Sequence, residues 1–428
     1  MSASTIGLEN LLYSIGSRNL ILFLIGKLTA SVGSSMYSFA VGLYVLSVTG
    51  SSVSFAITLL SSSLPRVILG PIAGVICDRV DRKKIIILSD WLCVILLTGL
   101  WLVFMFYSQS IWILYVSATL LSIINTFYST AINAAIPNMI ENERLQKAMS
   151  LNQIVLSSSM IAGPILAGIL YGIYSFSFFI GISIFTFAVS AIVSIFIHYH
   201  LHRKDQAANN KEPFFSSLKS GIVYSKSNPF LKNLMGIAFV INFLMSAYPV
   251  CVPFLVITIL QKSSFQLGIV ESGFAIGMLL LSLVLSIVKK QIQSHHYILG
   301  GLIGIGIIIS LISLPSVFGE HSIWSIVYMT LLSFLLGITC TIINIPIFVK
   351  LQSEIDDNYR GRVMSLLETV AIGTTPIGYI LFGFLLDVLP ITVVMCTLGI
   401  LLICFALFHY SKRTMKSIIH QNITELNG

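Results

Sequence analysis

Long apolar runs alternate with short polar segments along the whole chain. Each run is long enough to cross a bilayer as a helix, which takes roughly 20 residues. Read with a window of about 19 residues, the runs fall at residues 20–47, 54–76, 85–107, 111–136, 148–172, 176–197, 231–259, 267–288, 298–317, 323–349, 363–386 and 391–409. The pattern predicts an all-α membrane protein with twelve transmembrane helices, the first of them a retained helix and not a signal peptide.

The composition excludes a soluble globular protein. Hydrophobic residues make up 56% of the chain and charged residues only 9%, whereas about one quarter of a soluble domain is charged. The abundance of isoleucine, lysine and asparagine suggests a bacterial source.

The net charge of +8 is informative through its placement. If the N-terminus is cytosolic, all but three of the 24 Lys and Arg residues lie in cytosolic segments or at their edges; the exceptions are Lys27, Arg66 and Lys262. This asymmetry follows the positive-inside rule. We therefore expect a multi-pass protein of the bacterial cytoplasmic membrane with both termini in the cytosol, and no nucleic-acid partner.

The residue patterns of enzymes and metal sites are missing from the sequence. The six cysteines occur singly, without a Cys-x-x-Cys pair, and we expect reduced thiols. His198, His200 and His202 have no acidic or cysteine neighbour, so an interfacial role is expected and not a metal site. We expect no catalytic residue, no metal and no cofactor, and hence no enzyme.

The segment Gly70–Lys84, GPIAGVICDRVDRKK, joins two apolar runs and carries six charges within seven residues. Such a segment predicts a tight turn at the membrane surface, with basic residues that anchor it in the cytosol. Its spacing resembles the G-x-L-x-D-R-x-G-R-K loop between the second and third helices of major facilitator superfamily transporters. Asp81 stands where that family usually has a second glycine. A plain cytosolic anchor would also account for the basic residues.

The two halves of the chain repeat at an offset of 215 residues. Met149-Ser150-Leu151 superposes on Met364-Ser365-Leu366, and Gly168 superposes on Gly383. The repeat predicts two pseudo-symmetric six-helix bundles, related by an axis along the membrane normal as in the major facilitator fold. We expect an N-terminal bundle at residues 1–200, a cytosolic linker with an interfacial helix at 201–229, and a C-terminal bundle at 230–428.

Two further segments resemble the same superfamily. Arg360-Gly361-Arg362-Val363-Met364-Ser365-Leu366 is similar to the R-G-R-V-x-S-L run of the drug:proton antiporter branch that holds macrolide-efflux and enterobactin-exporter proteins. Gly163-Pro164 is similar to the glycine–proline element of antiporters, and predicts a kink in the fifth helix. The residues expected at a cytosolic gate are Gly74, Asp78, Arg79, Arg82, Arg144, Arg360 and Arg362.

Polar side chains recur at helical spacing on several spans, where lipid would not tolerate them. In the resembled fold the first, fourth, seventh and tenth helices surround a central cavity, and each of these helices has a polar face here. The alternative is that small polar residues hold neighbouring helices together. Arg66 is open to either role. The candidates for the substrate cavity are Lys27, Ser31, Ser34, Arg66, Asn125, Ser129, Asn242, Ser246, Thr341 and Asn344.

The chain has no G-x-x-x-x-G-K-[ST] loop, so ATP is not expected to drive transport directly. A proton gradient needs a titratable group inside the membrane. The candidates are, in order of preference, Glu368, Glu271 and Asp90. For Asp90 the alternative is a network with Asp78 and Arg82 at the cytosolic face.

The distribution of buried charge bears on the substrate. Lys27 and Arg66 lie in the first half and Glu271 and Glu368 in the second, so a zwitterionic or anionic amphipathic molecule would suit the cavity as well as a cationic drug. The sequence predicts a proton-coupled exporter of an amphipathic drug, antibiotic or siderophore that works by alternating access. Its expected partners are this substrate, protons and the lipid bilayer, and a monomer is expected. A lipid or lysophospholipid translocator and a non-transporting polytopic sensor are the alternatives.

Overall fold

The computed structural model describes residues 3–107, 110–139, 142–199, 223–225, 228–287, 295–318, 323–355, 363, 366–367 and 369–411. Within these residues there is no β-strand, and twelve helical segments are long and apolar enough to cross a membrane. The predicted all-α membrane fold is confirmed. Most of the predicted linker 201–229 lies outside the described residues.

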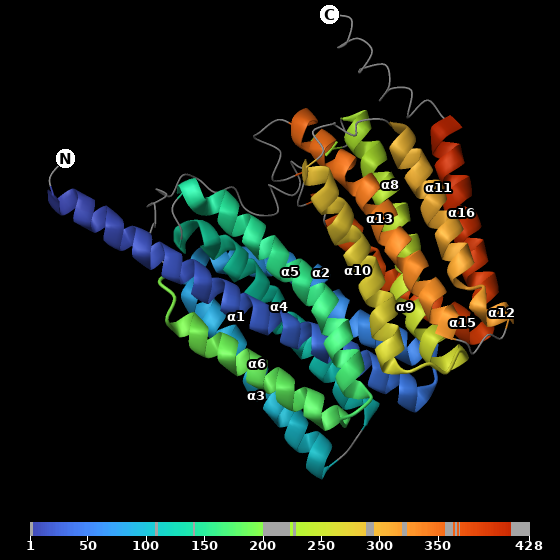
Figure 1. Ribbon diagram of the computed structural model, residues 1–428, viewed down its shortest axis with the longest axis horizontal. Helices are drawn as coiled ribbons and strands as arrows, with labels where there is room; N and C mark the ends of the chain where they lie inside the picture. Colours follow the sequence, from blue (N-terminus) through green and yellow to red (C-terminus); the bar gives the residue numbers. More distant parts are fainter. Residues whose placement is uncertain are drawn as a thin grey trace, which may run out of the picture. The chain divides into compact units, whose positions relative to one another are not determined.

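The helices follow one another along the chain as coloured in Figure 1. The elements of the N-terminal half are α1 (Ala3–Thr49), α2 (Ser52–Arg79), α3 (Arg82–Phe106), α4 (Ile111–Met139), α5 (Asn142–Tyr171) and α6 (Phe176–Ile195). Those of the C-terminal half are α8 (Pro229–Met245), α9 (Tyr248–Pro253), the π-helix η1 (Phe254–Ile259), α10 (Ser264–Ile287), α11 (His295–Ile312), α12 (Pro315–Phe318), α13 (Ile323–Glu354), α15 (Thr375–Val388) and α16 (Ile391–Ser411).

Internal contacts divide the chain into two compact units. The first consists of Met1–Tyr44 and Ser61–Lys211, and the second of Val45–Leu60 and Glu212–Gly428. The connection between α1 and α2, together with the adjoining helix ends, therefore belongs to the second unit.

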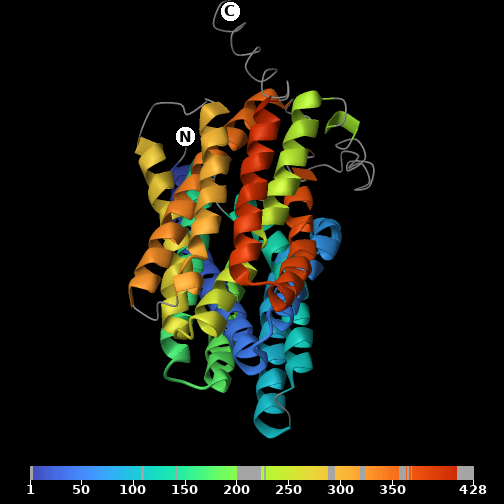
Figure 2. The same ribbon diagram turned by 90° about the vertical axis from the view of Figure 1, so that its right-hand side faces the viewer.

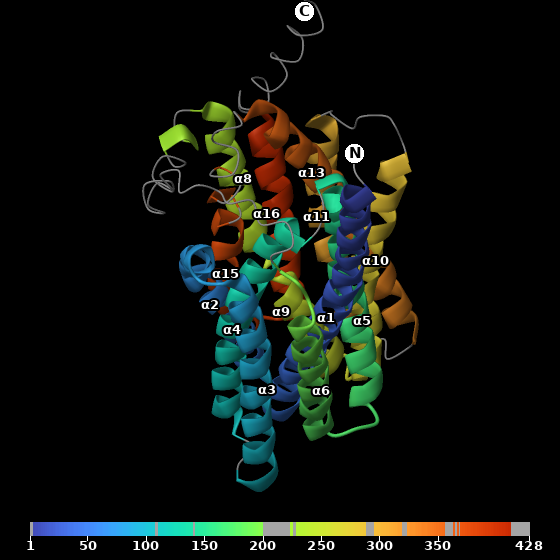
Figure 3. The same ribbon diagram turned by 90° about the vertical axis from the view of Figure 1, so that its left-hand side faces the viewer.

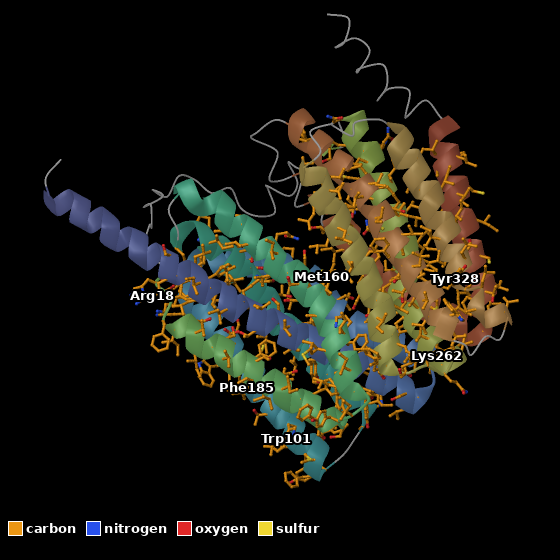
Figure 4. The ribbon with its side chains drawn as sticks, viewed as in Figure 1. Arg18, Trp101, Met160, Phe185, Lys262 and Tyr328 are labelled. Atoms are coloured by element: carbon orange, nitrogen blue, oxygen red, sulfur yellow. The ribbon has the colours of Figure 1, made fainter. Side chains whose placement is uncertain are left out.

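In the first unit, α3 packs against both α4 and α6 (Figure 3). Small residues bring α1 close to α5 and α6, because a Cβ added at Gly163 would overlap Ser35 and one added at Gly33 would overlap Thr186. α5 continues as a helix through Pro164. Phe185 is 69% exposed and projects from α6 away from the other helices of the unit (Figure 4), as expected for a lipid-facing side chain.

In the second unit, α10 packs along α13, and α11 packs against both α13 and α16 (Figure 2). Glycines permit the closest crossing. A Cβ added at Gly277 would overlap the carbonyl of Phe334, and one added at Gly337 would overlap the carbonyl of Phe274. α10 and α13 therefore touch through their backbones, which is typical of helix packing in membranes.

The seventh span, Leu231–Ile259, is interrupted. α8 ends at Met245, α9 follows after a two-residue turn, and the backbone then widens into η1 directly after Pro253. A proline lacks the amide hydrogen that would extend the regular ladder, so local departures of this kind are common beside it. The break lies in a buried part of the unit, where Val250, Cys251 and Leu255 are fully enclosed.

Candidate functional site

Lys27 is a buried cation on α1. Its side chain is 4% exposed, and its Nζ atom lies 5.9 Å from the centre of the Tyr128 ring on α4. This geometry is that of a cation–π contact. The guanidinium of Arg66, on α2, is close enough to repel the ammonium. The structure thus brings two of the predicted cavity residues, Lys27 and Arg66, into one electrostatic neighbourhood.

Further polar contacts join α1 to α4. The Asn125 Nδ2 atom donates a hydrogen bond of 3.2 Å to the Ser34 hydroxyl. One turn farther along α1, the Tyr37 and Ser117 hydroxyls lie 2.8 Å apart and both side chains are buried. Ser129 donates within its own helix, to the Thr126 carbonyl at 3.1 Å. Hence Asn125 of α4 bonds to Ser34, on the face of α1 that also carries Lys27 and Ser31.

Asp90 is 1% exposed between α3 and α6. Its Oδ2 atom accepts hydrogen bonds from the hydroxyls of Ser190 at 2.9 Å and Ser194 at 3.3 Å. Tyr128 and Tyr199 lie close enough to Asp90 to interact with its charge. Sequence reasoning missed the serines, although their four-residue spacing places both on one face of α6.

Arg82 bonds to two backbone carbonyls. The Arg82 Nη1 atom donates to the Ala134 carbonyl at 2.6 Å and its Nε atom donates to the Cys77 carbonyl at 3.4 Å. These bonds tie the start of α3 to the ends of α2 and α4. The expected alternative for Asp90, a network with Asp78 and Arg82, stays a prediction, because the Asp78 side chain lies outside the described part of the structure.

Asp81, the departure from the family motif, has a structural role. Its carboxylate accepts a 2.9 Å hydrogen bond from the Lys83 backbone N–H and thereby caps the N-terminus of α3. The Lys83 Nζ atom in turn donates to the carbonyls of Ile195 and Ile197 at 3.0 and 3.2 Å. The charged turn therefore fastens α3 to the end of α6.

Other predicted gate residues are placed only in part. Arg79 is exposed, and no described atom lies within 4 Å of a Cβ added at Gly74, so Gly74 does not bring two helices together. The side chains of Asp78 and Arg144 lie outside the described part of the structure, as do Arg360 and Arg362.

Two residues of α1 contact His198, which follows α6. Asn19 exchanges two hydrogen bonds with the His198 backbone, and Arg18, labelled in Figure 4, contacts the His198 ring.

A second polar cluster lies at the α9–α10–α13 junction. The Tyr248 hydroxyl donates a hydrogen bond of 3.0 Å to the Ser333 hydroxyl, and its ring lies 5.6 Å from that of Phe274. Glu271 on α10 is close enough to act on Tyr248 by its charge. Glu271, one of the predicted coupling acids, is therefore beside a buried tyrosine that sequence reasoning missed. Glu368 lies outside the described residues.

The remaining cavity candidates of the second unit make local contacts. Asn242 donates to the Ala238 carbonyl at 2.8 Å, and Thr341 donates to the Gly337 carbonyl at 2.9 Å, in each case one turn back along the same helix. Ser246 is 3% exposed against Gly378 of α15. Asn344 is exposed. The contact of Ser246 fits helix packing, which was the alternative to a cavity face, whereas the bond of Thr341 stays within its own helix.

Comparison with known proteins identifies the family. The family model of the Major Facilitator Superfamily matches residues 23–372. The chain belongs to the Major Facilitator Superfamily. It is thus a multi-pass membrane transporter and not an enzyme, and the predicted family resemblance is confirmed.

The relatives of this transporter include exporters. It is 24% identical over 389 residues to macrolide efflux protein A of Streptococcus pyogenes, an alignment that covers 89% of this chain and 93% of that protein. It is 24% identical to the staphyloferrin A transporter of Staphylococcus aureus, with 82% and 86% of the two chains covered. The crystal structure of the nucleoside transporter NupG shares its fold, with a TM-score of 0.68, 14% identity and coverage of 92% and 99%.

Proposed function

We propose that this transporter exports an amphipathic small molecule, such as a drug, an antibiotic or a siderophore, in exchange for protons. The observation that supports proton coupling is the surroundings of its membrane-embedded acids. Asp90 is held by two serine hydroxyls and Glu271 lies beside Tyr248, and among the described residues neither acid is paired with a cation.

A carboxylate taken out of water is costly to keep charged unless a cation or a proton neutralises it. With no cation paired to either acid in the described residues, a proton is the partner that can come and go during a transport cycle. Glu368, which falls within the span 363–386 predicted from the sequence, remains the preferred candidate, and Glu271 and Asp90 complete the set of acids to test.

The direction of transport is supported by the efflux activity in the name of the streptococcal relative. In the proposed cycle, two halves at residues 1–200 and 230–428 give alternating access to a central site, with 201–229 as the linker. We expect the transporter to work as a monomer in the bacterial cytoplasmic membrane. Both termini are proposed to lie in the cytosol, because this orientation satisfies the positive-inside rule.

The test is uptake of dyes and macrolides into inside-out vesicles with an acidic interior. Uptake should fall to the background when an ionophore collapses the pH gradient, and in at least one of Glu368→Gln, Glu271→Gln and Asp90→Asn. Asp81→Asn is the matched control, because it removes a carboxylate but keeps a side-chain oxygen that caps α3. Uptake that ignores the gradient, or that occurs only with lysophospholipid, would refute proton-coupled export.

A further inference from the structure

Among the residues that the structure describes, the buried ammonium of Lys27 has no neutralising partner. Within the described residues no carboxylate pairs with it, and its contacts there are the face of the Tyr128 ring and the repulsion from Arg66. A lysine buried this deeply is normally paired, because leaving its charge without an anion is costly. A second cation nearby increases that cost. An anion beside Lys27 would lower the free energy of this buried charge, and the described part of the chain does not provide one.

Tyr128 holds the ammonium in place. Its side chain is 7% exposed, and its hydroxyl lies within hydrogen-bonding reach of Ser190 and close enough to Asp90 to interact with its charge. The ring face attracts the Lys27 cation but is a weaker partner than a carboxylate. Lys27 is therefore positioned by an aromatic contact that leaves its ammonium able to form an ion pair.

We propose that Lys27 binds a carboxylate of the transported molecule, with Tyr128 as its positioning residue and Arg66 adding to the positive potential. The substrate class is then an amphipathic carboxylic acid, in which the acid pairs with Lys27 and an apolar body fills the remaining space. This inference rests on the proposed function, because it takes the ligand of Lys27 to be the transported molecule. The ion pair itself, however, can be measured without any transport.

The experiment measures binding to the purified transporter in lipid nanodiscs, with no gradient present. The probes are an amphipathic rhodamine dye as the free carboxylate and the same dye as its methyl ester. Lys27→Gln should weaken binding of the acid on the order of tenfold, because it removes the charged partner of the carboxylate. Binding of the ester should change less than about twofold. Equal changes for acid and ester, or no change for either, would refute the proposal.

Matched variants separate binding from folding. Lys27→Arg keeps the charge and should retain the preference for the acid, whereas Lys262→Gln removes a lysine outside the spans and should bind both dyes as the native chain does. Tyr128→Phe keeps the ring and should retain acid binding, while Tyr128→Leu should weaken it. If Tyr128→Phe loses as much acid binding as Tyr128→Leu, the ring does not position Lys27. Failure of gradient-driven uptake alongside acid-selective binding would reject proton-coupled export and leave the Lys27 site standing.

Discussion

The carboxylate of Asp387 caps the first turn of α2 at Ser52. The Ser52 backbone N–H and hydroxyl donate to Asp387 Oδ1 at 3.1 and 2.5 Å, and the Ser51 hydroxyl donates to Oδ2 at 3.2 Å. Gly383 permits this approach, because a Cβ added there would overlap Ala56. A carboxylate at a helix N-terminus satisfies free N–H groups and complements the helix dipole. The second unit thus holds the first turn of α2 through one acid at the end of α15.

Removing this acid should loosen α2 from α15. Asp387→Ala is expected to cost about 1–2 kcal/mol, as loss of a helix N-cap does, and to lower the thermal unfolding midpoint of the purified transporter. Asp387→Asn keeps one acceptor oxygen and should lie between the native chain and the alanine variant. Unfolding midpoints that are the same for all three proteins would show that the cap contributes nothing.

Ser190 and Ser194, which donate hydrogen bonds to Asp90, should contribute to the free energy of unfolding only while Asp90 can carry a charge. The double variant Ser190→Ala/Ser194→Ala leaves a buried carboxylate without its hydroxyl donors, at an expected cost of about 1–3 kcal/mol. Adding Asp90→Asn removes the charge, so the triple variant should be less destabilised than the sum of its parts. A denaturation series on the single, double and triple variants measures this coupling. Strict additivity would mean that the serines do not act through Asp90.

Arg82 should require its guanidinium and not merely its charge. The side chain reaches two carbonyls, of Ala134 and Cys77, from separate nitrogens. A lysine has no planar fork with which to make both bonds. We expect Arg82→Lys to recover only part of the activity that Arg82→Ala loses in vesicle uptake, and to leave the turn more open to protease cleavage. Full recovery by lysine would make Arg82 a simple cytosolic anchor.

Hydropathy predicted the membrane spans because length and apolarity are local properties of the sequence. The span 231–259 was predicted with both of its boundaries, yet its break and the π-helix after Pro253 were not, since a hydropathy window averages over them. α5 continues as a helix through Pro164, and Gly163 lies against Ser35. The kink expected at Gly163-Pro164 stays a prediction, because a helix can bend at a proline without being interrupted.

Contacts between residues that are distant in sequence could not be predicted from hydropathy. Ser52 and Asp387 are separated by 335 positions, and the predicted eleventh span ended just before this acid. Ser190 and Ser194 meet Asp90 only because α3 packs on α6. Small polar residues such as Ser246 suit both a cavity and a helix crossing, so their pattern alone could not distinguish the two roles. Lys27, by contrast, could be identified from the sequence, because a charged side chain inside an apolar span is costly and usually has a functional role.

The crossing of α10 and α13 should tolerate no side chain at Gly337. Even a methyl group there would overlap the Phe274 carbonyl, which is backbone and cannot rotate away. Gly337→Ala is therefore expected to destabilise the transporter by about 1–3 kcal/mol through overpacking. Gly300→Ala on α11 is the control, because no described atom lies within 4 Å of its added Cβ. That substitution should be neutral or stabilising by up to about 1 kcal/mol through helix propensity. Thermal unfolding and the yield of monodisperse protein measure both variants, and equal tolerance of the two substitutions would contradict the backbone contact between α10 and α13.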